Sequence, residues 1–328
     1  MAAKIRWGIL ATGWIAELFV KDLLLTGHQV TAVGSRTQTS ADRFAAQFGI
    51  PTAHGSYEAL AADPNVDIIY IATPHPQHAH AATLALNAGK HVLVEKAFTL
   101  NAADAADIVA LARTKGLVVL EAMWTRFLPH MCRVRDIIAA GTIGEVRSIT
   151  ADHRQKLPDD PKHRLNALDL GGGALLDLGI YPISFTWDIL GKPASIAALA
   201  TFRETGADAQ VATIFHYASG AMATTLSSSD SAGPNRAVVV GTKGRIELDR
   251  VWYSPTTLRV YDNENNVLET FDRAVKGRGM QFQADEAERL IAAGLTAGDI
   301  MPPAQSVEIM ATLDEVRRQI GLKYPQEI

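Results

Sequence analysis

The stretch IRWGILATGWIAELFVKDLLL, residues 5–25, decides the fold of this chain. It opens with a short apolar run, residues 5–10, that is typical of a buried strand, and its remainder predicts a helix. Between the two, Ala11, Gly13 and Ala16 occupy the three positions of the dinucleotide-binding pattern G-x-G-x-x-G/A. The central glycine lets the backbone approach a pyrophosphate, which the free N–H groups of a helix N-terminus attract. We therefore expect a dinucleotide here, and a sharp turn without a ligand is the alternative. The residues expected to hold it are Gly8, Thr12, Gly13, Trp14 and Ile15.

Strand-like and helical segments alternate through the first third of the chain. The expected strands are 5–10, 29–35, 67–72, 91–94 and 117–120, and the expected helices are 13–25, 40–48, 56–62, 77–87 and 101–114. We expect Asn101 to cap the last of these helices. The run DIIYIA, residues 67–72, is almost wholly apolar, as expected for a strand covered on both faces. This alternation predicts a doubly wound parallel sheet, an α/β Rossmann domain over residues 1–121.

The end of the second expected strand indicates which dinucleotide binds. An NAD site usually has an acidic residue about 20 residues after the glycines, where it accepts from the ribose hydroxyl. No acid occurs between Val30 and Ala41, and the strand ends in Ser35, Arg36 and Thr37. A guanidinium can pair with a 2′-phosphate, and the two hydroxyls can donate to it. We predict NADP as the cofactor rather than NAD; a solvated loop charge is the alternative for Arg36.

The stretch ATPHPQHAHAATLALNAGKHVLVEKA, residues 72–97, begins with three closely spaced histidines and ends in Glu95-Lys96-Ala97. His75, His78 and His80 are poorly spaced for a metal, because residues two apart on a helix face different sides. We therefore predict no metal. In an open α/β sheet, ligands bind beyond the carboxyl ends of the strands. The cofactor-side residues expected at two such ends are Thr73, Pro74, His75, His78, Glu95 and Lys96.

The pattern changes after Glu121, where strand-like runs follow one another with few helices between them. The expected strands are 196–202, 210–217, 221–227, 236–241, 245–249, 257–261 and 267–271, and the expected helices are 131–139, 280–293 and 303–320. We predict a second, α+β domain over residues 122–328, with a large, mostly antiparallel open sheet and a last helix that is able to pack back on the first domain.

Four motifs resemble one known family across nearly the whole chain. They are WGILATGWIA, the stretch 72–97, GGGALLDLGIYP at 171–182 and GTKG at 241–244. The chain resembles the glucose–fructose oxidoreductase/inositol dehydrogenase (Gfo/Idh/MocA) family. Within it, EAMWTRFLP at 121–129 and the tyrosine of LLDLGIYP are most similar to dimeric dihydrodiol dehydrogenases and NADP-dependent D-xylose dehydrogenases.

The resemblance implies roles for particular residues. Lys96 takes the place of the family's catalytic lysine, and Tyr181 that of the acid/base, while Asp177 would bind a neighbouring substrate hydroxyl. Residues 177 and 181 are four apart, so we expect both side chains on one face of a helix. The further candidates for binding substrate come from segments expected between the cofactor and the second sheet, and they are Trp124, Arg126, His153 and Arg164. Three residues depart from the family pattern: Ala11 for a glycine, Ala97 for the proline of Glu-Lys-Pro, and Ser184 for an aspartate of the inositol branch.

The resemblance and the composition together set the functional expectation. The formal net charge is −4 with no basic block, which argues against nucleic acid as a partner, and no apolar run approaches the length of a membrane span. The chain begins directly with a strand and has one cysteine, so we expect a cytoplasmic protein. We predict an NADP-dependent oxidoreductase for a secondary alcohol of a sugar or cyclic trans-diol, and a homodimer through the second sheet. The alternatives are an inositol or anhydrosugar dehydrogenase and a non-catalytic NADP-sensing regulator.

Overall fold

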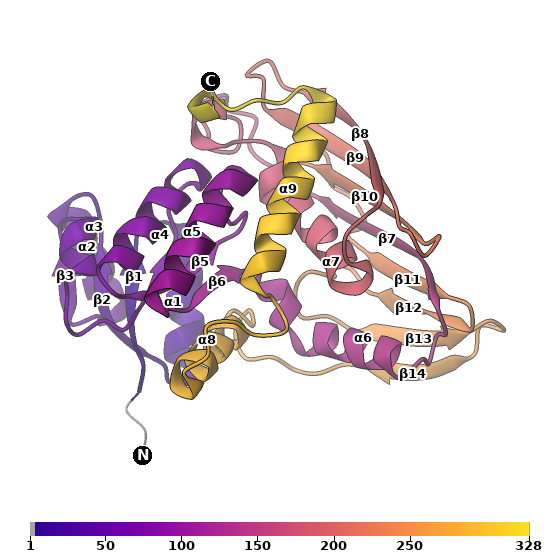
Figure 1. Ribbon diagram of the computed structural model, residues 1–328, viewed down its shortest axis with the longest axis horizontal. Coiled ribbons are helices and arrows are strands. Elements are labelled where there is room, and N and C mark those ends of the chain that lie inside the picture. The colour runs from indigo at the N-terminus through magenta and orange to yellow at the C-terminus, as the bar shows by residue number, and fades with distance from the viewer. Residues whose placement is uncertain (1–3, 328) are drawn as a thin grey trace. The chain divides into compact units, whose positions relative to one another are not determined.

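The computed structural model describes residues 4–327, which divide into two compact units (Figure 1). The first unit comprises residues up to Trp124 together with Lys276–Met310. The second comprises Thr125–Val275 and the residues from Ala311 onward. The break at Trp124 lies close to the expected boundary at residue 121. The segment 276–310 belongs with the first unit, although the sequence places it after the second sheet.

The first unit contains a six-stranded parallel sheet in the order β3-β2-β1-β4-β5-β6. Its strands are β1 (Arg6–Leu10), β2 (Gln29–Gly34), β3 (Thr52–His54), β4 (Ile68–Ile71), β5 (His91–Glu95) and β6 (Val119–Ala122). Every strand pair in it is parallel, which confirms the predicted doubly wound sheet. All four residues of β4 are buried, as its unbroken apolar run predicted. The short edge strand β3 was not predicted.

Helices connect the strands of this sheet (Figure 1). They are α1 (Trp14–Thr26), α2 (Gln38–Phe48), α3 (Tyr57–Ala61), η1 (His75–Gln77), α4 (His78–Asn87) and α5 (Ala102–Lys115). Asn101 caps α5 as predicted, since its side chain accepts from the N–H of Asp104. Helix α8 (Gln281–Ala293), from the late segment of the chain, packs beside α1.

His28 joins the end of α1 to α8. Its Nδ1 lies 2.8 Å from Glu288 Oε1 and its Nε2 lies 3.3 Å from Asp285 Oδ1. Burial opposes the charged ring, but the hydrogen bonds to Asp285 and Glu288 outweigh it and raise the pKa of His28 to about 9. This pKa lies above the ordinary value of 6.5, so the imidazolium stabilises the fold fully below pH 6.5 and ceases to do so as the pH rises through 9.

We expect the free energy of unfolding to fall by about 3 kcal/mol between pH 6 and pH 10 through this one group, since each pKa unit is worth about 1.4 kcal/mol. Urea titrations of the wild type and of His28→Gln measure it. The variant should lack this part of the pH dependence and be closest to the wild type at the alkaline end. Parallel pH curves for the two proteins would refute the assignment.

The second unit contains an eight-stranded sheet in the order β14-β13-β12-β11-β7-β10-β9-β8. Its strands are β7 (Val146–Arg154), β8 (Ser195–Phe202), β9 (Asp208–His216), β10 (Met222–Ser228), β11 (Ala237–Gly241), β12 (Gly244–Leu248), β13 (Leu258–Asp262) and β14 (Val267–Phe271). All neighbours pair antiparallel except β7 and β10, which confirms the predicted mostly antiparallel sheet. The sequence did not predict β7, which lies at the centre.

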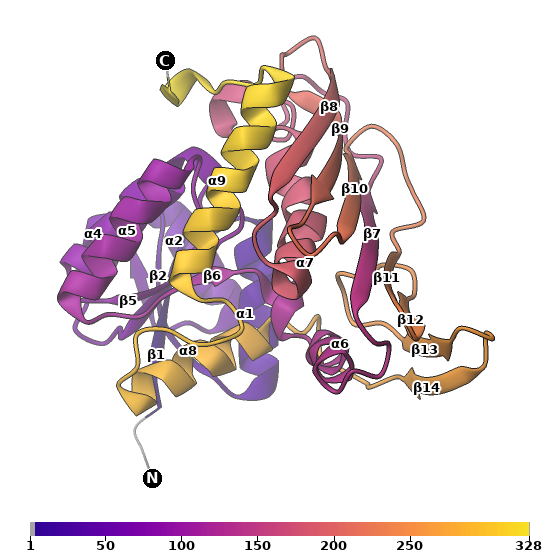
Figure 2. The same cartoon turned by 45° about the vertical axis from the view of Figure 1, so that its right-hand side comes forward.

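Helices cover one face of this sheet, with α6 and α7 on the same side in Figure 2. The helical segments are η2 (Trp124–Phe127), α6 (Pro129–Ala139), η3 (Leu168–Leu170), η4 (Leu175–Gly179), α7 (Ile180–Leu190), η5 (Pro325–Glu327) and the end of α9 (Pro303–Ile320). No helix among the described residues of this unit covers the opposite face. No helix of residues 4–327 is long and apolar enough to cross a bilayer.

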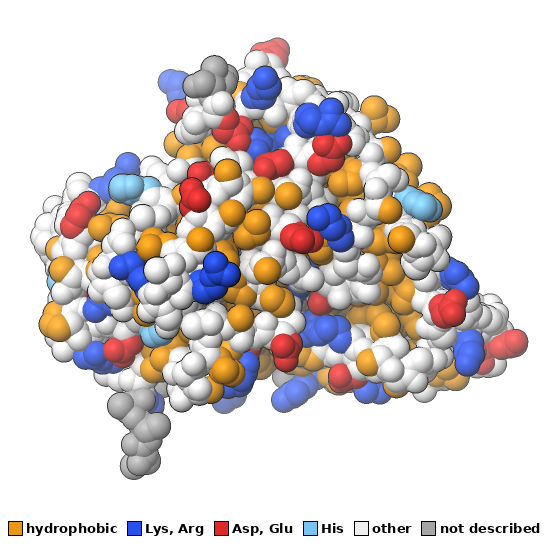
Figure 3. Space-filling model, in the orientation of Figure 1, with side chains coloured by type: hydrophobic (Ala, Val, Ile, Leu, Met, Phe, Trp, Pro, Cys, Tyr) orange, Lys and Arg blue, Asp and Glu red, His pale blue; other side chains and the backbone are white. Residues whose placement is uncertain are grey.

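The uncovered face carries exposed apolar side chains at one end. Strand registers place Leu199, Ile214, Met222 and Val240 on the same side of the sheet. Leu199 is 80% exposed and Ile214 is 48% exposed. Figure 3 shows hydrophobic side chains along the margin over β8 and β9. The predicted pairing of this sheet with another subunit would cover them, and it remains a prediction.

Candidate functional site

The turn between β1 and α1 leaves a helix N-terminus without a side-chain cap. Gly13 is the N-cap residue, makes no side-chain capping hydrogen bond, and has open space where a Cβ would project. Ala11, at the position of the first glycine, has φ 79°, the left-handed conformation that glycine favours. The backbone therefore keeps the form of a glycine turn although the first glycine is absent. Such a turn fits a pyrophosphate, because its N–H groups remain available.

Gly8 has a different reason to be glycine. It lies inside β1, where a Cβ would come within 2.9 Å of Val66 Cγ1 and 3.2 Å of Leu60 Cδ1. Packing therefore accounts for the missing side chain, and a contact from Gly8 to the cofactor remains only a prediction. Thr12 lies in the turn itself. Its hydroxyl is 3.4 Å from the hydroxyl of Ser35, which follows β2.

The segment after β2 holds an exposed arginine between two anchored neighbours. Ser35 is buried and its N–H donates to the carbonyl of His54, while the Thr37 side chain caps α2 by accepting from the N–H of Ser40. Arg36 makes no hydrogen bond or ion pair with any residue in the range 4–327. A guanidinium with its donors available, held beside two hydroxyls, fits the 2′-phosphate of NADP.

His78 ties the end of β4 to the segment after β5. It is fully buried, and its ring nitrogens lie 2.8 Å from the carbonyl of Thr73 and 2.9 Å from that of Ala97. Burial lowers the pKa of His78, although both carbonyls favour a protonated ring. His75 Nε2 lies 3.2 Å from the Lys96 carbonyl, on the same segment. Both histidines therefore hold the backbone around Lys96, and among residues 4–327 no three His, Cys, Asp or Glu side chains are grouped as metal ligands.

Glu95 and Lys96 end β5 with different surroundings. Glu95 is buried, and the hydroxyl of Tyr70 on β4 donates to it. Lys96 is half-buried, and its peptide bond with Ala97 is cis. The lysine therefore follows a carboxylate that is fixed inside the sheet, at the carboxyl ends of two adjacent strands, where ligands bind in such folds.

In the second unit, a glycine-rich segment begins the helix that carries Asp177 and Tyr181. Asp208 of β9 is buried and its Oδ2 accepts from the N–H of Leu175 at 2.6 Å. A side chain at Gly173, which has φ 135°, would overlap with the Asp208 carboxylate. Burial raises the pKa of Asp208 to about 6, against the hydrogen bonds from the helix N-terminus. The absence of a side chain at Gly173 therefore lets the buried carboxylate of Asp208 reach the start of the helix.

The helix itself begins with a π-helical turn, η4, and continues as α7. The sequence predicted an ordinary α-helix here, in which residues 177 and 181 share a face. Asp177 lies within the π turn and Tyr181 lies one turn later in α7. Such turns occur frequently at functional sites. Arg164 Nη1 lies 3.7 Å from Asp177 Oδ1, so two predicted substrate residues are brought together.

Tyr181 packs in an aromatic cluster with His153 and Tyr253. The ring of His153 stacks on that of Tyr253 at 3.7 Å and meets that of Tyr181 edge-on at 5.0 Å. Gln155 donates to His153 Nε2 at 2.8 Å and to the Tyr253 hydroxyl at 3.4 Å, so this nitrogen of His153 accepts. Burial raises the pKa of Tyr253 to about 12. The sequence reasoning missed Tyr253, whose only signal is the Trp252–Tyr253 pair in a loop between two strands.

Arg126 is buried against α7. It is 2% exposed, its Nε donates to the Ser184 hydroxyl at 2.9 Å, and its Nη2 donates to the Ser184 carbonyl at 2.7 Å. Its Nη1 lies 3.8 Å from Asp188. These contacts fix Arg126 against α7, and its predicted contact with substrate remains a prediction. Trp124 belongs to the first unit, as Arg278 does. The centre of its ring lies 5.7 Å from the Arg278 guanidinium.

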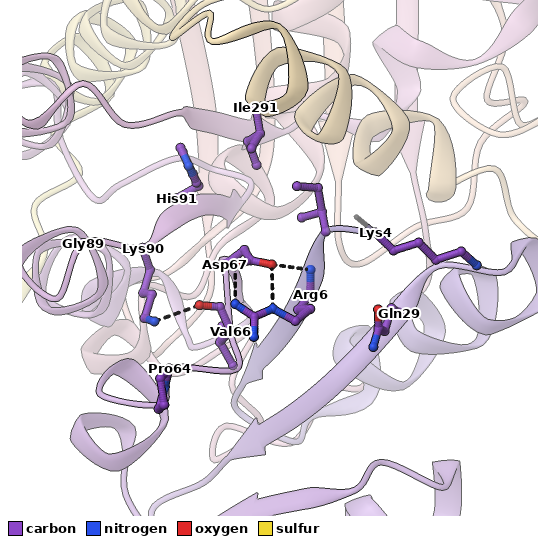
Figure 4. Close-up of a pocket in the computed structure, with 11 residues that line it drawn as sticks. Lys4, Arg6, Gln29, Pro64, Val66, Asp67, Gly89, Lys90, His91 and Ile291 are labelled. Atoms are coloured by element: carbon purple, nitrogen blue, oxygen red, sulfur yellow. Dashed lines mark hydrogen bonds and ion pairs between the residues drawn. The ribbon is translucent and has the colours of Figure 1, made fainter. Parts of the chain in front are cut away.

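A cavity of about 710 Å³ lies at the opposite end of the first sheet, where the strands begin (Figure 4). Arg6 spans it and pairs with Asp67 through Nη2 at 2.7 Å and Nε at 2.9 Å. Lys90 donates to the carbonyls of Asp63 and Val66. These cations are already satisfied by the protein, and ligands of such sheets bind at the carboxyl ends. We therefore regard this cavity as part of the scaffold.

The two units present different functional groups. The first unit presents an uncapped helix N-terminus, an available guanidinium at the end of β2 and a lysine at the end of β5. These groups suit a phosphorylated dinucleotide. The second unit presents a phenol within an aromatic cluster and a carboxylate beside a guanidinium, groups that suit proton transfer and the binding of hydroxyls.

Comparisons with known proteins place the chain in a family. Residues 5–123 match the model of an oxidoreductase family with an NAD-binding Rossmann fold, and residues 131–247 match the GFO/IDH/MocA C-terminal domain. The mouse trans-1,2-dihydrobenzene-1,2-diol dehydrogenase is 40% identical over 98% of this chain and 99% of its own. The D-xylose 1-dehydrogenase (NADP(+)) of Hypocrea jecorina is 36% identical over 99% of this chain and 94% of its own.

Solved structures agree with this placement. The 3-ketoreductase KijD10 of Actinomadura kijaniata, crystallised with NADP and TDP-benzene, superposes with a TM-score of 0.86 at 27% identity, covering 97% of this chain and 98% of that one. The aldose–aldose oxidoreductase of Caulobacter crescentus has the same fold, with a TM-score of 0.87 at 24% identity, covering 97% of each chain. Since motifs, fold and full-length relatives coincide, the chain belongs to the GFO/IDH/MocA family of oxidoreductases.

Proposed function

We propose that this chain is an NADP-dependent oxidoreductase that transfers a hydride between a secondary alcohol of a sugar or cyclic trans-diol and the nicotinamide. The observation that carries the proposal is the turn at Gly13, uncapped and open, with the available guanidinium of Arg36 at the end of the neighbouring strand. Full-length relatives named as dehydrogenases of a diol and of D-xylose support the substrate class.

This geometry supports the following assignment of residues to the cofactor. The N–H groups at the start of α1 would bind the pyrophosphate, and Arg36, with Ser35 and Thr37, would bind the 2′-phosphate. When bound, NADP supplies a nicotinamide that accepts or returns a hydride at C4. His75 and His78 hold the backbone of the lysine segment through the carbonyls of Lys96 and Ala97.

Side chains of this protein carry out the proton transfer. In oxidation, the phenolate of Tyr181 takes the proton of the substrate hydroxyl, and the hydride leaves the carbon that bears this hydroxyl. The proposed role of Lys96 is to assist this tyrosine, because a cation beside a phenol would favour its charged form. Asp177, paired with Arg164, accepts a hydrogen bond from a neighbouring hydroxyl. His153 and Tyr253 orient the phenol by packing against it.

We expect purified protein to reduce NADP⁺ with at least one of D-xylose, D-glucose, myo-inositol, an anhydrosugar and a trans-dihydrodiol. The absorbance of the reduced nicotinamide measures it, and the Lys96→Met variant should lose turnover by roughly 100-fold or more, as expected for a group that assists acid–base catalysis. Turnover confined to myo-inositol or the anhydrosugar would favour the alternative dehydrogenases. Tight binding of NADPH with no turnover on any compound would favour the non-catalytic sensor.

The assembly and the location of the protein are further parts of the proposal. We propose a homodimer through the uncovered face of the second sheet, supported by the exposed side chains of Leu199, Ile214 and Met222. Light scattering coupled to size exclusion would return the mass of one chain if this is wrong. A cytoplasmic location remains the expectation from the sequence.

A further inference from the structure

An exposed arginine from the late segment of the chain, Arg278, lies beside Trp14, the first residue of α1. The guanidinium of Arg278 lies 6.0 Å from the centre of the Trp14 ring and 5.7 Å from that of Trp124. At these distances a cation is attracted to the face of an indole. Within residues 4–327 the same guanidinium makes no hydrogen bond or ion pair. Its N–H donors are therefore available, while two aromatic rings limit where it moves.

The backbone beneath this arginine is fixed by a buried acid. Asp22 of α1 is 3% exposed, and its carboxylate accepts from the N–H of Arg278 at 3.0 Å and from that of Met280 at 2.9 Å. Gly277 has φ 65°, and a side chain there would overlap with the same carboxylate. The segment before α8 is thus pinned to α1 by an interaction that admits only glycine at position 277.

The hydrogen bonds to Asp22 place the side chain of Arg278 near the N-terminus of α1. Trp14 and Asp22 are eight residues apart, so they lie on one face of the helix about two turns from each other. Arg278 is attached at Asp22 and its guanidinium lies near Trp14, the residue next to Gly13. Trp14 is 66% exposed, an unusual state for a tryptophan, and a dinucleotide on this turn would cover it.

We propose that Arg278 is a cofactor-binding residue that pairs with the pyrophosphate of the bound dinucleotide, with its guanidinium held between Trp14 and Trp124. The inference rests on the proposed function, because it takes NADP as the ligand. It divides the phosphates between two arginines: Arg36 recognises the 2′-phosphate that distinguishes NADP from NAD, and Arg278 recognises the pyrophosphate that both share. A fork-shaped cation suits a pyrophosphate, since it donates to two oxygens at once.

The test compares the dissociation constants of three ligands by calorimetry. Arg278→Ala should weaken NADPH and NADH by the same factor, roughly 10-fold or more, as expected for a charge-assisted pair. It should leave adenosine 2′-monophosphate unchanged, because that ligand has no pyrophosphate. Arg36→Ala should do the reverse, weakening NADPH and adenosine 2′-monophosphate but not NADH. Arg273→Ala, which removes an exposed arginine five residues away, is the matched control and should change none of them.

A second variant tests the anchor without removing the charge. Gly277→Ala keeps Arg278 but forces its segment away from Asp22, so it should also weaken both dinucleotides while circular dichroism remains that of the wild type. Affinities of Arg278→Ala within twofold of the wild type for NADPH and NADH would overturn this inference alone. An increase only in the KM of the alcohol substrate would overturn it as well, by moving Arg278 to the substrate. Failure of the wild type to bind either dinucleotide would overturn the proposed function together with the inference.

Discussion

Tyr181→Phe is expected to lower kcat by roughly 10²- to 10⁴-fold, the range that a positioned acid or base contributes. The substitution removes one hydroxyl and keeps the ring that packs against His153 and Tyr253. The dissociation constant of NADPH should therefore stay within about twofold of the wild type, because the cofactor binds through the first unit. Steady-state kinetics and calorimetry on the same preparation measure the two effects.

Tyr253→Phe is the matched control for this variant. It makes the same change in the neighbouring ring, whose centre lies 5.5 Å from that of Tyr181. Burial raises the pKa of Tyr253 to about 12, so its hydroxyl stays protonated at neutral pH and is not available as a base. We expect Tyr253→Phe to keep most of the activity. Near-normal turnover by Tyr181→Phe, or an equal loss in both variants, would move the proton transfer to another group.

Arg36→Ala is expected to weaken NADPH by roughly 10- to 150-fold and to leave NADH within about twofold, since a charge-assisted pair is worth about 1.5–3 kcal/mol. The guanidinium is exposed and makes no hydrogen bond or ion pair with residues 4–327, so its removal costs the fold little. Titration of both reduced cofactors against the quenching of tryptophan fluorescence measures the ratio.

Two further variants sharpen the cofactor assignment. Arg36→Lys keeps the charge but not the two-pronged geometry and should fall between the wild type and Arg36→Ala. Arg43→Ala removes another exposed arginine, on α2, and should behave as the wild type. Equal weakening of NADPH and NADH by Arg36→Ala would contradict the assignment of Arg36 to the 2′-phosphate.

The first sheet could be predicted because its signals are local. Residues 67–72 are almost wholly apolar and become the buried strand β4, and the turn at Gly13 lies between strand and helix as its pattern required. The helix cap at Asn101 was also predicted from a single side chain. Such features depend on neighbours in the sequence, so one chain is enough to identify them.

The centre of the second sheet could not be predicted in the same way. β7 buries Ile149, Ala151 and His153 on one side, while its outward side carries charged and polar residues. A small residue and a histidine at buried positions weaken the apolar alternation that announces a strand. His153 was predicted to lie between cofactor and sheet. It lies within this strand, with its ring stacked on Tyr253.

The contacts made by distant segments were equally out of reach. Arg278 donates its N–H to Asp22, which lies 256 residues away in the sequence. The ring of Tyr253 stacks on that of His153, which belongs to a distant strand. Nothing in the composition of either segment names its partner. The same holds for Arg126, whose guanidinium donates to the hydroxyl and the carbonyl of Ser184 in α7. Candidate residues could be named from the motifs, whereas their partners required the fold.

The transfer of deuterium from an alcohol to the cofactor is the most direct evidence of whether this chain catalyses hydride transfer to NADP⁺. The protein would be incubated with NADP⁺ and either D-xylose deuterated at C1 or a trans-dihydrodiol deuterated at its carbinol carbons. Mass spectrometry of the recovered reduced cofactor then locates the label. We expect one deuterium at C4 of the nicotinamide with at least one of these substrates, and in the same incubation time at least about 100-fold less labelled cofactor with Tyr181→Phe, in line with its lower kcat. Tight binding of NADPH without any reduced, deuterated cofactor from either substrate would contradict this expectation.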